Sequence, residues 1–551
     1  MTMMKRIGMN AVRRSDSQRG RWALPGLLLA LAAQTAGAEP TLPVSADALP
    51  ARVEQVRKRF DVPGIAIAIV KDGRVVLEQG FGLREIGKPD PVDAHTLFAI
   101  ASNTKAFTAA SLAMLADAQK LSLDDRVIEH LPWFAMSDAY VTREMRVRDL
   151  LVHRSGLGLG AGDMLFWPAT TYTTEEVVRR LRDVPLKTSF RSAYAYDNIL
   201  YAVAGLVIEQ ASGQRYADFV RERIFAPLGM SETRINSESL AGAADIAVGH
   251  AKFDFTALKP VPAMSWSNNS AAGGIYSNVH DLTRWVRMQL DGGAMAQAAD
   301  GKEQRLFSAE RQREMWSLIT PIPIAKPIVP ELAPTMPNFF GYGEGWFVGD
   351  YRGRKLVWHT GGWPGMVSRI TLVPEEKLGI IVLTNQEVGA AYSALTYGIL
   401  DDYLLAADQP HPDWVAAYAA AVEKTQSRAD EGWQKHVAAR DATSKPSLAL
   451  EKYAGTYRDV WYGDIVIAQE RGKLVMRFSR TAQLVGDLEP WQHDTFFVRW
   501  RDRSLNADAL LTFALTPDAG IREARMEAAS SLTDFSFDFQ DLRLLPVSDA
   551  H

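Results

Sequence analysis

The sequence predicts a mixed α/β (α+β) chain: an antiparallel sheet flanked by helices, an all-helical subdomain, and then a small all-β barrel. Three observations predict it. Strand-like runs lie at both ends of the region 46–405. Residues 124–230, between those runs, are mostly helical by pattern. From Tyr453 onward, short strand-like runs recur about every ten residues, which is typical of a small barrel or sandwich.

The region 46–405 predicts one domain whose elements follow in a clear order. Residues 46–61 predict a helix, and two strand-like runs on either side of Lys71-Asp72-Gly73 predict a hairpin. Ser102 opens a helical segment, SNTKAFTAASLAMLADAQ, that contains no helix breaker. Strands then return in the runs GEGWFVGD, RKLVWHT, SRITLVP and LGIIVLTN, and a helix over about 389–405 closes the domain.

Two further segments follow this domain. Residues 406–449 are alanine-rich, charged and interrupted by Pro410 and Pro412, so we expect a helical linker there. Residues 450–547 hold the predicted barrel. With 551 residues and 47 % hydrophobic content, the chain is long enough for both domains and their cores.

Residues 1–38 are typical of a secretory signal peptide. Six basic residues precede an apolar run over 22–33, and Ala36-Gly37-Ala38 offers a cleavage site. We therefore expect a periplasmic or secreted protein with no membrane insertion after cleavage; an uncleaved anchor is the alternative. Cleavage leaves 55 basic and 64 acidic residues, a net charge of −9, which argues against a nucleic-acid partner. The absence of cysteine excludes disulfides and thiolate chemistry from this sequence.

The candidate chemistry begins at Ser102 and Lys105. A serine hydroxyl becomes a nucleophile when a base takes its proton, and a lysine three residues on shares its helix face. Tyr196 is the second proton-handling candidate. Because lysine and tyrosine perturb each other in a partly dry cleft, either a phenolate beside an ammonium or a neutral amine beside a phenol would supply the base. The sequence leaves both states open.

Two later motifs complete the set: Tyr196-Asp197-Asn198 and His359-Thr360-Gly361-Gly362. With Ser102-x-x-Lys105, they resemble the three motifs of the serine β-lactamase or penicillin-recognising superfamily, in its class C-like branch. The resemblance covers roughly residues 46–405. The segment after Tyr453 resembles the lipocalin-like domain that follows many of these hydrolases.

The resemblance implies a β-lactamase/transpeptidase-like fold and a role for each motif. Ser102 would be acylated while Lys105 and Tyr196 relay protons, and the backbone N–H groups of Ser102 and Gly362 would form an oxyanion hole. The implied substrate-binding residues, which orient and line the substrate, are Asn198, His359, Thr360, Gly361 and Gly362. It implies no metal and no organic cofactor.

Histidine at position 359 departs from the lysine of many β-lactamases. A neutral histidine supplies less positive charge for a β-lactam carboxylate, so we expect a peptidase or esterase. The preferred hypothesis is a serine hydrolase acting on linear peptides with D- or unusual residues. A carboxylesterase with weak β-lactamase activity and a penicillin-binding protein without turnover are the alternatives.

The oligomeric state and the role of the barrel, as a cap on the cleft, an oligomerisation module or a stabilising partner, are not set by the sequence. His153 is expected to be structural. Four aromatic residues are candidates for either pocket wall or core: Phe166, Trp167, Trp266 and Trp363.

Overall fold

The computed structural model describes residues 42–44, 48–295, 304–406 and 408–547. The predicted signal peptide lies outside these ranges. Within them, no helix is both long enough and apolar enough to cross a membrane.

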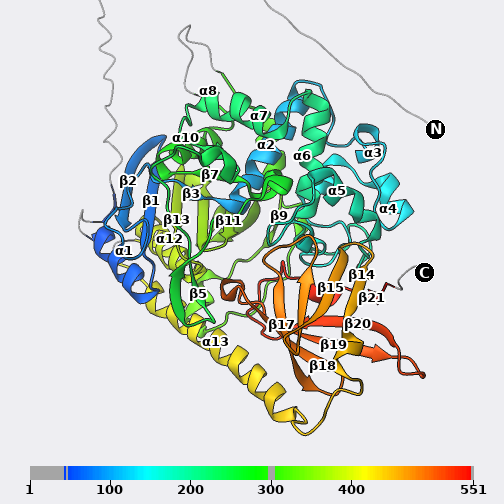
Figure 1. The fold of residues 1–551 in the computed structure, drawn as a ribbon. Helices are drawn as coiled ribbons and strands as arrows, with labels where there is room; N and C mark the ends of the chain where they lie inside the picture. The colour runs from blue at the N-terminus through cyan, green and yellow to red at the C-terminus, as the bar shows by residue number, and fades with distance from the viewer. Residues whose placement is uncertain (1–41, 45–47, 296–303, 407, 548–551) are drawn as a thin grey trace, which may run out of the picture. The chain divides into compact units, whose positions relative to one another are not determined.

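An eight-stranded antiparallel sheet forms the centre of the hydrolase-like part, in the order β2-β1-β13-β12-β11-β10-β9-β8 (Figure 1). The predicted hairpin and the four later strands are all in it. The run GIAIAIV is almost continuously apolar because β1 is buried on both faces. The strands are β1 (Gly64–Lys71), β2 (Arg74–Gly82), β8 (Thr320–Pro321), β9 (Phe340–Tyr342), β10 (Phe347–Tyr351), β11 (Arg354–Trp363), β12 (Met366–Val373) and β13 (Leu378–Thr384).

Helices cover both faces of this sheet. On one face, α1 (Ala48–Arg59), α12 (Gly389–Leu404) and α13 (Trp414–Ala439) pack on alternate strand residues such as Ile67 and Val382. In Figure 1, α1 and the long α13 follow each other along this side. On the other face lie α2 (Thr104–Asp117) and α10 (Val279–Leu290).

The helical subdomain is made of short helices and turns that surround α2 and α6, so the prediction for residues 124–230 is confirmed. Nearly all of α2 is buried, because this helix lies between the sheet and the subdomain. Helix α6 spans Ile199–Ser212. The short helices in this part of the chain are α3 (Val127–His130), α4 (Ala139–Glu144), α5 (Thr174–Arg179), α7 (Tyr216–Val220), α8 (Ala226–Leu228), α9 (Ser270–Gly273) and α11 (Ala309–Met315).

Two small sheets complete this part of the chain. A three-stranded sheet has the order β3-β7-β4, and β5 pairs with β6 as a hairpin. Their strands are β3 (Phe98–Ala99), β4 (Arg234–Ile235), β5 (His250–Phe253), β6 (Ala257–Pro260) and β7 (Ile275–Ser277).

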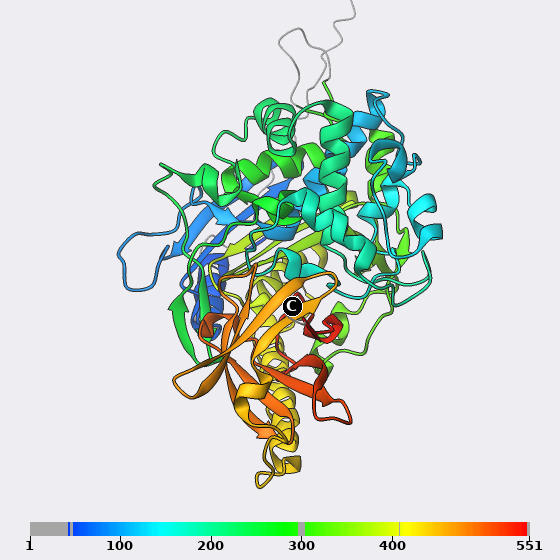
Figure 2. The ribbon, with the colours of Figure 1, turned by 45° about the vertical axis from the view of Figure 1, so that its right-hand side comes forward.

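The C-terminal domain is an eight-stranded antiparallel barrel in the order β20-β19-β18-β17-β16-β15-β14-β21, orange to red in Figure 2. Ala524 and Leu544 exchange backbone hydrogen bonds of 2.8 and 3.0 Å, which nearly closes the sheet on itself. The predicted barrel is therefore confirmed. Its strands are β14 (Gly455–Asp459), β15 (Gly463–Glu470), β16 (Lys473–Phe478), β17 (Val485–Gln492), β18 (Thr495–Trp500), β19 (Ala509–Leu515), β20 (Ile521–Ala528) and β21 (Leu545–Pro546).

Candidate active site

Ser102 lies in a 3-10 turn, Ala101–Asn103, that leads directly into α2. Ala101 has a left-handed φ of 46°, which costs an alanine about 1 kcal/mol and turns the chain sharply before the serine. Strand β11 lies directly behind this turn. A Cβ at Gly361 would come within 2.1 Å of the Ile100 carbonyl oxygen, so only glycine lets the strand approach so closely.

Lys105 is completely buried beside Ser102, with its Nζ 3.0 Å from the serine Oγ. The same nitrogen lies 2.7 Å from the Asn198 Oδ1 and 2.9 Å from the Ala272 carbonyl oxygen. Burial holds the pKa of Lys105 well below its usual range. A neutral amine has two N–H donors, and two carbonyl acceptors engage both. Its lone pair is then left for the proton of Ser102.

Tyr196 is half-buried, and its hydroxyl interacts with that of Ser102. The Lys105 Nζ lies 4.9 Å from the centre of the Tyr196 ring. Burial raises the pKa of Tyr196 well above its usual value, so the phenol keeps its proton. Of the two states that the sequence leaves open, the surroundings favour neutral Lys105 beside a phenol.

Asn198 connects Lys105 to a residue that the sequence did not single out, Asp163. The Nδ2 of Asn198 donates to the Asp163 Oδ2 at 2.8 Å, while its Oδ1 faces Lys105. Asp163 is buried, and this burial raises its pKa to about 7. No local motif marks Asp163, which follows the glycine-rich loop of residues 155–160.

His359 and Thr360 point to opposite faces of β11, as successive strand residues must. The His359 ring faces Tyr196, its Nδ1 donates to the Thr360 carbonyl at 2.6 Å, and its Nε2 accepts from the Tyr342 hydroxyl at 2.7 Å. Burial and the nearby Lys105 lower its pKa to about 3, so the ring is neutral. The Thr360 hydroxyl instead interacts with Tyr392 of α12, away from Ser102.

His153 lies behind Tyr196, with ring centroids 4.2 Å apart, and its Nδ1 accepts the Asp197 backbone N–H at 2.9 Å. It is fully buried, and burial lowers its pKa well below the usual value. A neutral ring that supports the tyrosine loop agrees with the structural role expected for it.

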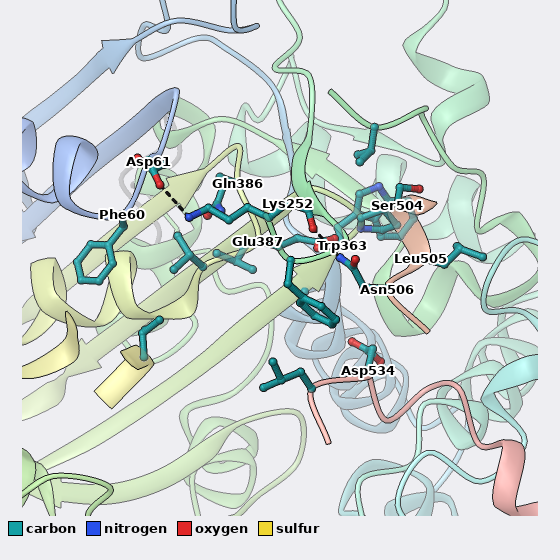
Figure 3. Close-up of a pocket in the computed structure, with 18 of the residues that line it drawn as sticks. Phe60, Asp61, Lys252, Trp363, Gln386, Glu387, Ser504, Leu505, Asn506 and Asp534 are labelled. Atoms are coloured by element: carbon teal, nitrogen blue, oxygen red, sulfur yellow. Dashed lines mark hydrogen bonds and ion pairs between the residues drawn. The ribbon is translucent and has the colours of Figure 1, made fainter. Parts of the chain in front are cut away.

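A cleft of about 520 Å³ is lined by Gly362, an exposed glycine near the end of β11. Figure 3 shows this cleft, with the neighbouring Trp363 labelled. A methyl group added to Gly362 would meet no atom within 4 Å. Trp167 and Trp363 line this cleft, whereas Phe166 and Trp266 are buried behind them. The cleft is also lined by Glu387 of the hydrolase-like part and by seven barrel-domain residues: Gln483, Ser504, Leu505, Asn506, Leu532, Asp534 and Phe537.

The described part of the chain contains no group of three or more histidine and acidic side chains that could hold a metal ion. The groups around Ser102 are an amine, a phenol, an amide and a neutral imidazole, which suit proton transfer and nucleophilic attack.

Comparison with known proteins agrees with this chemistry. The family model described as Beta-lactamase matches residues 49–404, and the model described as domain of unknown function DUF3471 matches residues 439–546. The unguisins hydrolase of Aspergillus campestris is 28 % identical over 491 residues, covering 85 % of this chain and 86 % of that protein. The protein flp of Staphylococcus aureus strain MW2 is 26 % identical over 337 residues, covering 60 % of this chain and 61 % of that protein.

Solved structures share the fold at low sequence identity. The octameric penicillin-binding protein homologue from Pyrococcus abyssi has a TM-score of 0.53 and 22 % identity, covering 91 % of this chain and all of that one. EstCE1, a hydrolase with promiscuous acyltransferase activity, has a TM-score of 0.52 and 20 % identity, covering 65 % of this chain and 99 % of that one. With the family model matching well over half of its length, the chain belongs to the beta-lactamase family of serine hydrolases.

Proposed function

We propose that this hydrolase cleaves linear peptides with D- or otherwise unusual residues, through an acyl-enzyme on Ser102. The observation that carries the acyl-enzyme on Ser102 is the setting of Lys105, whose two N–H bonds are engaged by carbonyl acceptors 2.7 and 2.9 Å away. Its lone pair then faces the Ser102 Oγ at 3.0 Å, which is the arrangement a general base needs.

In the proposed acylation step, the Ser102 Oγ attacks the substrate carbonyl carbon as its proton passes to the Lys105 Nζ. The carbonyl oxygen becomes an oxyanion, which the N–H groups of Ser102 and Gly362 would bind. When the C–N bond breaks, the leaving nitrogen takes a proton from Tyr196, and the Lys105 ammonium returns one to the phenolate. An ester joins the acyl group to Ser102, and Lys105 is neutral again.

In deacylation, Lys105 acts as the base again, with water in place of the Ser102 hydroxyl. A water molecule attacks the ester carbon and gives its proton to Lys105. The ester C–O bond breaks, the Ser102 oxygen takes that proton back, and the acid product leaves. Because the same base serves both halves, loss of Lys105 is expected to stop the cycle at acylation.

The cleft supports a peptide substrate more than a β-lactam. Both nitrogens of His359 are engaged and the ring is neutral, so it offers no positive charge for a carboxylate. Glu387 and Asp534 are among the residues that line the cleft. Burial raises the pKa of both carboxyl groups, to about 7 for Glu387, so they offer both hydrogen-bond donors and acceptors to a peptide near neutral pH. The names of similar proteins, an unguisins hydrolase and a D-amino acid amidase, point the same way.

A carboxylesterase is the second candidate, because nothing in the Ser102, Lys105 and Tyr196 set discriminates an ester from an amide. The fold similarity to the hydrolase EstCE1 is in keeping with this second candidate. We also propose that the protein works in the periplasm or outside the cell, on the strength of its N-terminal sequence.

The test is to incubate the protein with a peptide mixture, half of it containing D-residues, beside the Ser102→Ala variant and with p-nitrophenyl acetate in parallel. Serine-dependent cleavage next to D-residues, seen by mass spectrometry, is the expected result. Ester turnover without peptide cleavage would favour the esterase. In a separate incubation with a β-lactam, a stable adduct without product release would indicate a penicillin-binding protein. Peptide cleavage by Ser102→Ala would refute the mechanism.

A further inference from the structure

A segment of the C-terminal domain, residues 534–538 between β20 and β21, reaches the active site. The Phe535 ring meets Tyr196 edge-on, with centroids 6.0 Å apart. Its carbonyl oxygen lies so close to Gly160 that an added Cβ there would come within 2.7 Å of it. Gly160 also has a left-handed φ of 67°, so the glycine-rich loop is shaped to receive this segment.

Ser536 of this segment extends the chain of contacts that begins at Lys105. Its hydroxyl donates to the Asp163 Oδ2 at 2.8 Å, and the Asn198 Nδ2 donates to that same oxygen at 2.8 Å. Both hydrogen bonds lie among buried side chains. A residue of the barrel domain is therefore two hydrogen bonds away from Asn198, and Asn198 holds Lys105.

The orientation of the Asn198 amide matters because its two ends do opposite things. With Asp163 as the acceptor, Nδ2 turns toward the acid and Oδ1 toward Lys105. A flipped amide would present its NH₂ group to the lysine, whose lone pair would accept that N–H in place of the Ser102 proton. The lone pair of Lys105 would then be occupied by Asn198 and could not accept the proton of Ser102.

We propose that Ser536 is a positioning residue supplied by the C-terminal domain: together with Asp163 it fixes the Asn198 amide, so that Lys105 keeps its lone pair for Ser102. The proposal rests on the proposed function only in taking Ser102 as the nucleophile.

Asp163 has acidic neighbours, and the hydrogen bond from Ser536 must be considered together with them. The Asp538 Oδ2 accepts the Gly162 N–H at 2.7 Å, and burial raises the pKa of Asp538 well above its usual value, with the charge of Asp163 adding to the rise. Asp538 is thus a neutral neighbour, and the hydroxyl of Ser536 helps Asp163 to remain an acceptor. The ionisable groups that act on Asp163 or respond to its charge are Lys105, Tyr196, Asp197, Asp534 and Asp538.

The test measures how fast a fluorophosphonate probe modifies Ser102 in the full-length chain. The Ser102 oxygen bonds to phosphorus, fluoride leaves, and the serine proton goes to the base, so the rate reports nucleophile activation without a natural substrate. We expect Ser536→Ala to slow labelling about tenfold or more, the effect of one lost hydrogen bond to a charged group, and Ser536→Thr to restore it.

Asp254→Asn is the matched control. Asp254 forms an exposed ion pair with Arg503 of the barrel domain, away from Asn198, and asparagine tolerates its left-handed φ of 51°. This variant loses a contact between the domains and is expected to label at the wild-type rate.

A pH profile of the labelling rate separates positioning from simple stabilisation. In the wild type, the rate is expected to fall as pH drops through about 7, where Asp163 gains a proton. Ser536→Ala removes a bond to the carboxylate, so this limb should move to higher pH, whereas Asp254→Asn should leave it in place. An unchanged rate and limb in Ser536→Ala would overturn the proposal. An unlabelled wild type would overturn the Ser102 mechanism and, with it, this inference.

Discussion

At the scale of single residues, the site depends on a lysine whose surroundings keep its amine neutral. Lys105 has no exposed surface, and no carboxylate hydrogen-bonds its Nζ in the described structure. Asp163 lies behind Asn198, and its charge raises the pKa of Lys105. This effect opposes the lowering by burial but does not cancel it. The amine is therefore neutral where a solvent-exposed lysine would be charged, near pKa 10.4.

This setting fixes the sign of the pH dependence. As pH falls through the lowered pKa of Lys105, the amine gains a proton and loses its lone pair. The value of kcat/KM should therefore decrease with falling pH, and the midpoint of this decrease should lie well below pH 10. Lys105→Arg, whose guanidinium stays protonated, should lose about 10²- to 10⁴-fold in kcat. A pH–rate profile with a ready chromogenic substrate measures both. A limb at the pKa of free lysine would contradict the argument.

At the scale of elements, strand β11 does two jobs with adjacent residues. Gly361 lets the strand touch the turn of Ser102, and the Ser368 Oγ on the neighbouring strand β12 donates to the Ile100 carbonyl at 2.8 Å. Gly362, one residue later, is exposed at the cleft. Strand β11 therefore contacts the turn that carries Ser102 through Gly361 and lines the cleft through Gly362.

Two neighbouring substitutions test this. Gly361→Ala would drive a methyl group into the Ile100 carbonyl and should lower the free energy of unfolding by about 1–3 kcal/mol. Gly362→Ala meets no atom within 4 Å and should leave the free energy of unfolding near that of the wild type. Urea unfolding followed by fluorescence compares the two, and equal effects would show that β11 does not approach Ser102 this closely.

At the scale of the whole molecule, the two domains share one hydrophobic core, which includes Phe107 and Trp285 in the first and Trp461 and Trp500 in the second. Tyr172 lies at this junction. Its hydroxyl donates to the Tyr462 carbonyl, and the guanidinium groups of Arg180 and Arg480 lie 4.5 and 4.9 Å from the centre of its ring.

A shared core should make the domains unfold together. We expect a single thermal transition in calorimetry for the wild-type chain and, for Tyr172→Ala, a loss of about 3 kcal/mol, as for other buried aromatics, with the transitions separating. Tyr140→Ala, at a tyrosine that is 58 % exposed on α4, is the control and should change little. Two transitions already present in the wild type would contradict a shared core.

How far the sequence predicted this molecule depends on the distance between partners. Ser102 and Lys105 are three residues apart, so their pairing could be predicted from helix geometry, and the strands followed from their patterns. Asp163 and Ser536 are 373 residues apart, and no periodicity indicates such a contact. Alternation along β11 does indicate that His359 and Thr360 face opposite sides, although the family motif placed both on the substrate edge.

The contact between Asp163 and Ser536 has a consequence for how the enzyme is made. During translation, Asp163 is added to the chain 373 residues before Ser536. The hydrolase domain can therefore fold around Ser102 before Ser536 has been made. A nascent or interrupted chain would then hold Ser102 and Lys105 without the hydrogen bond from Ser536 that helps to fix the Asn198 amide. Full activation of the serine would therefore wait until the segment that carries Ser536 has been made and has packed against Asp163.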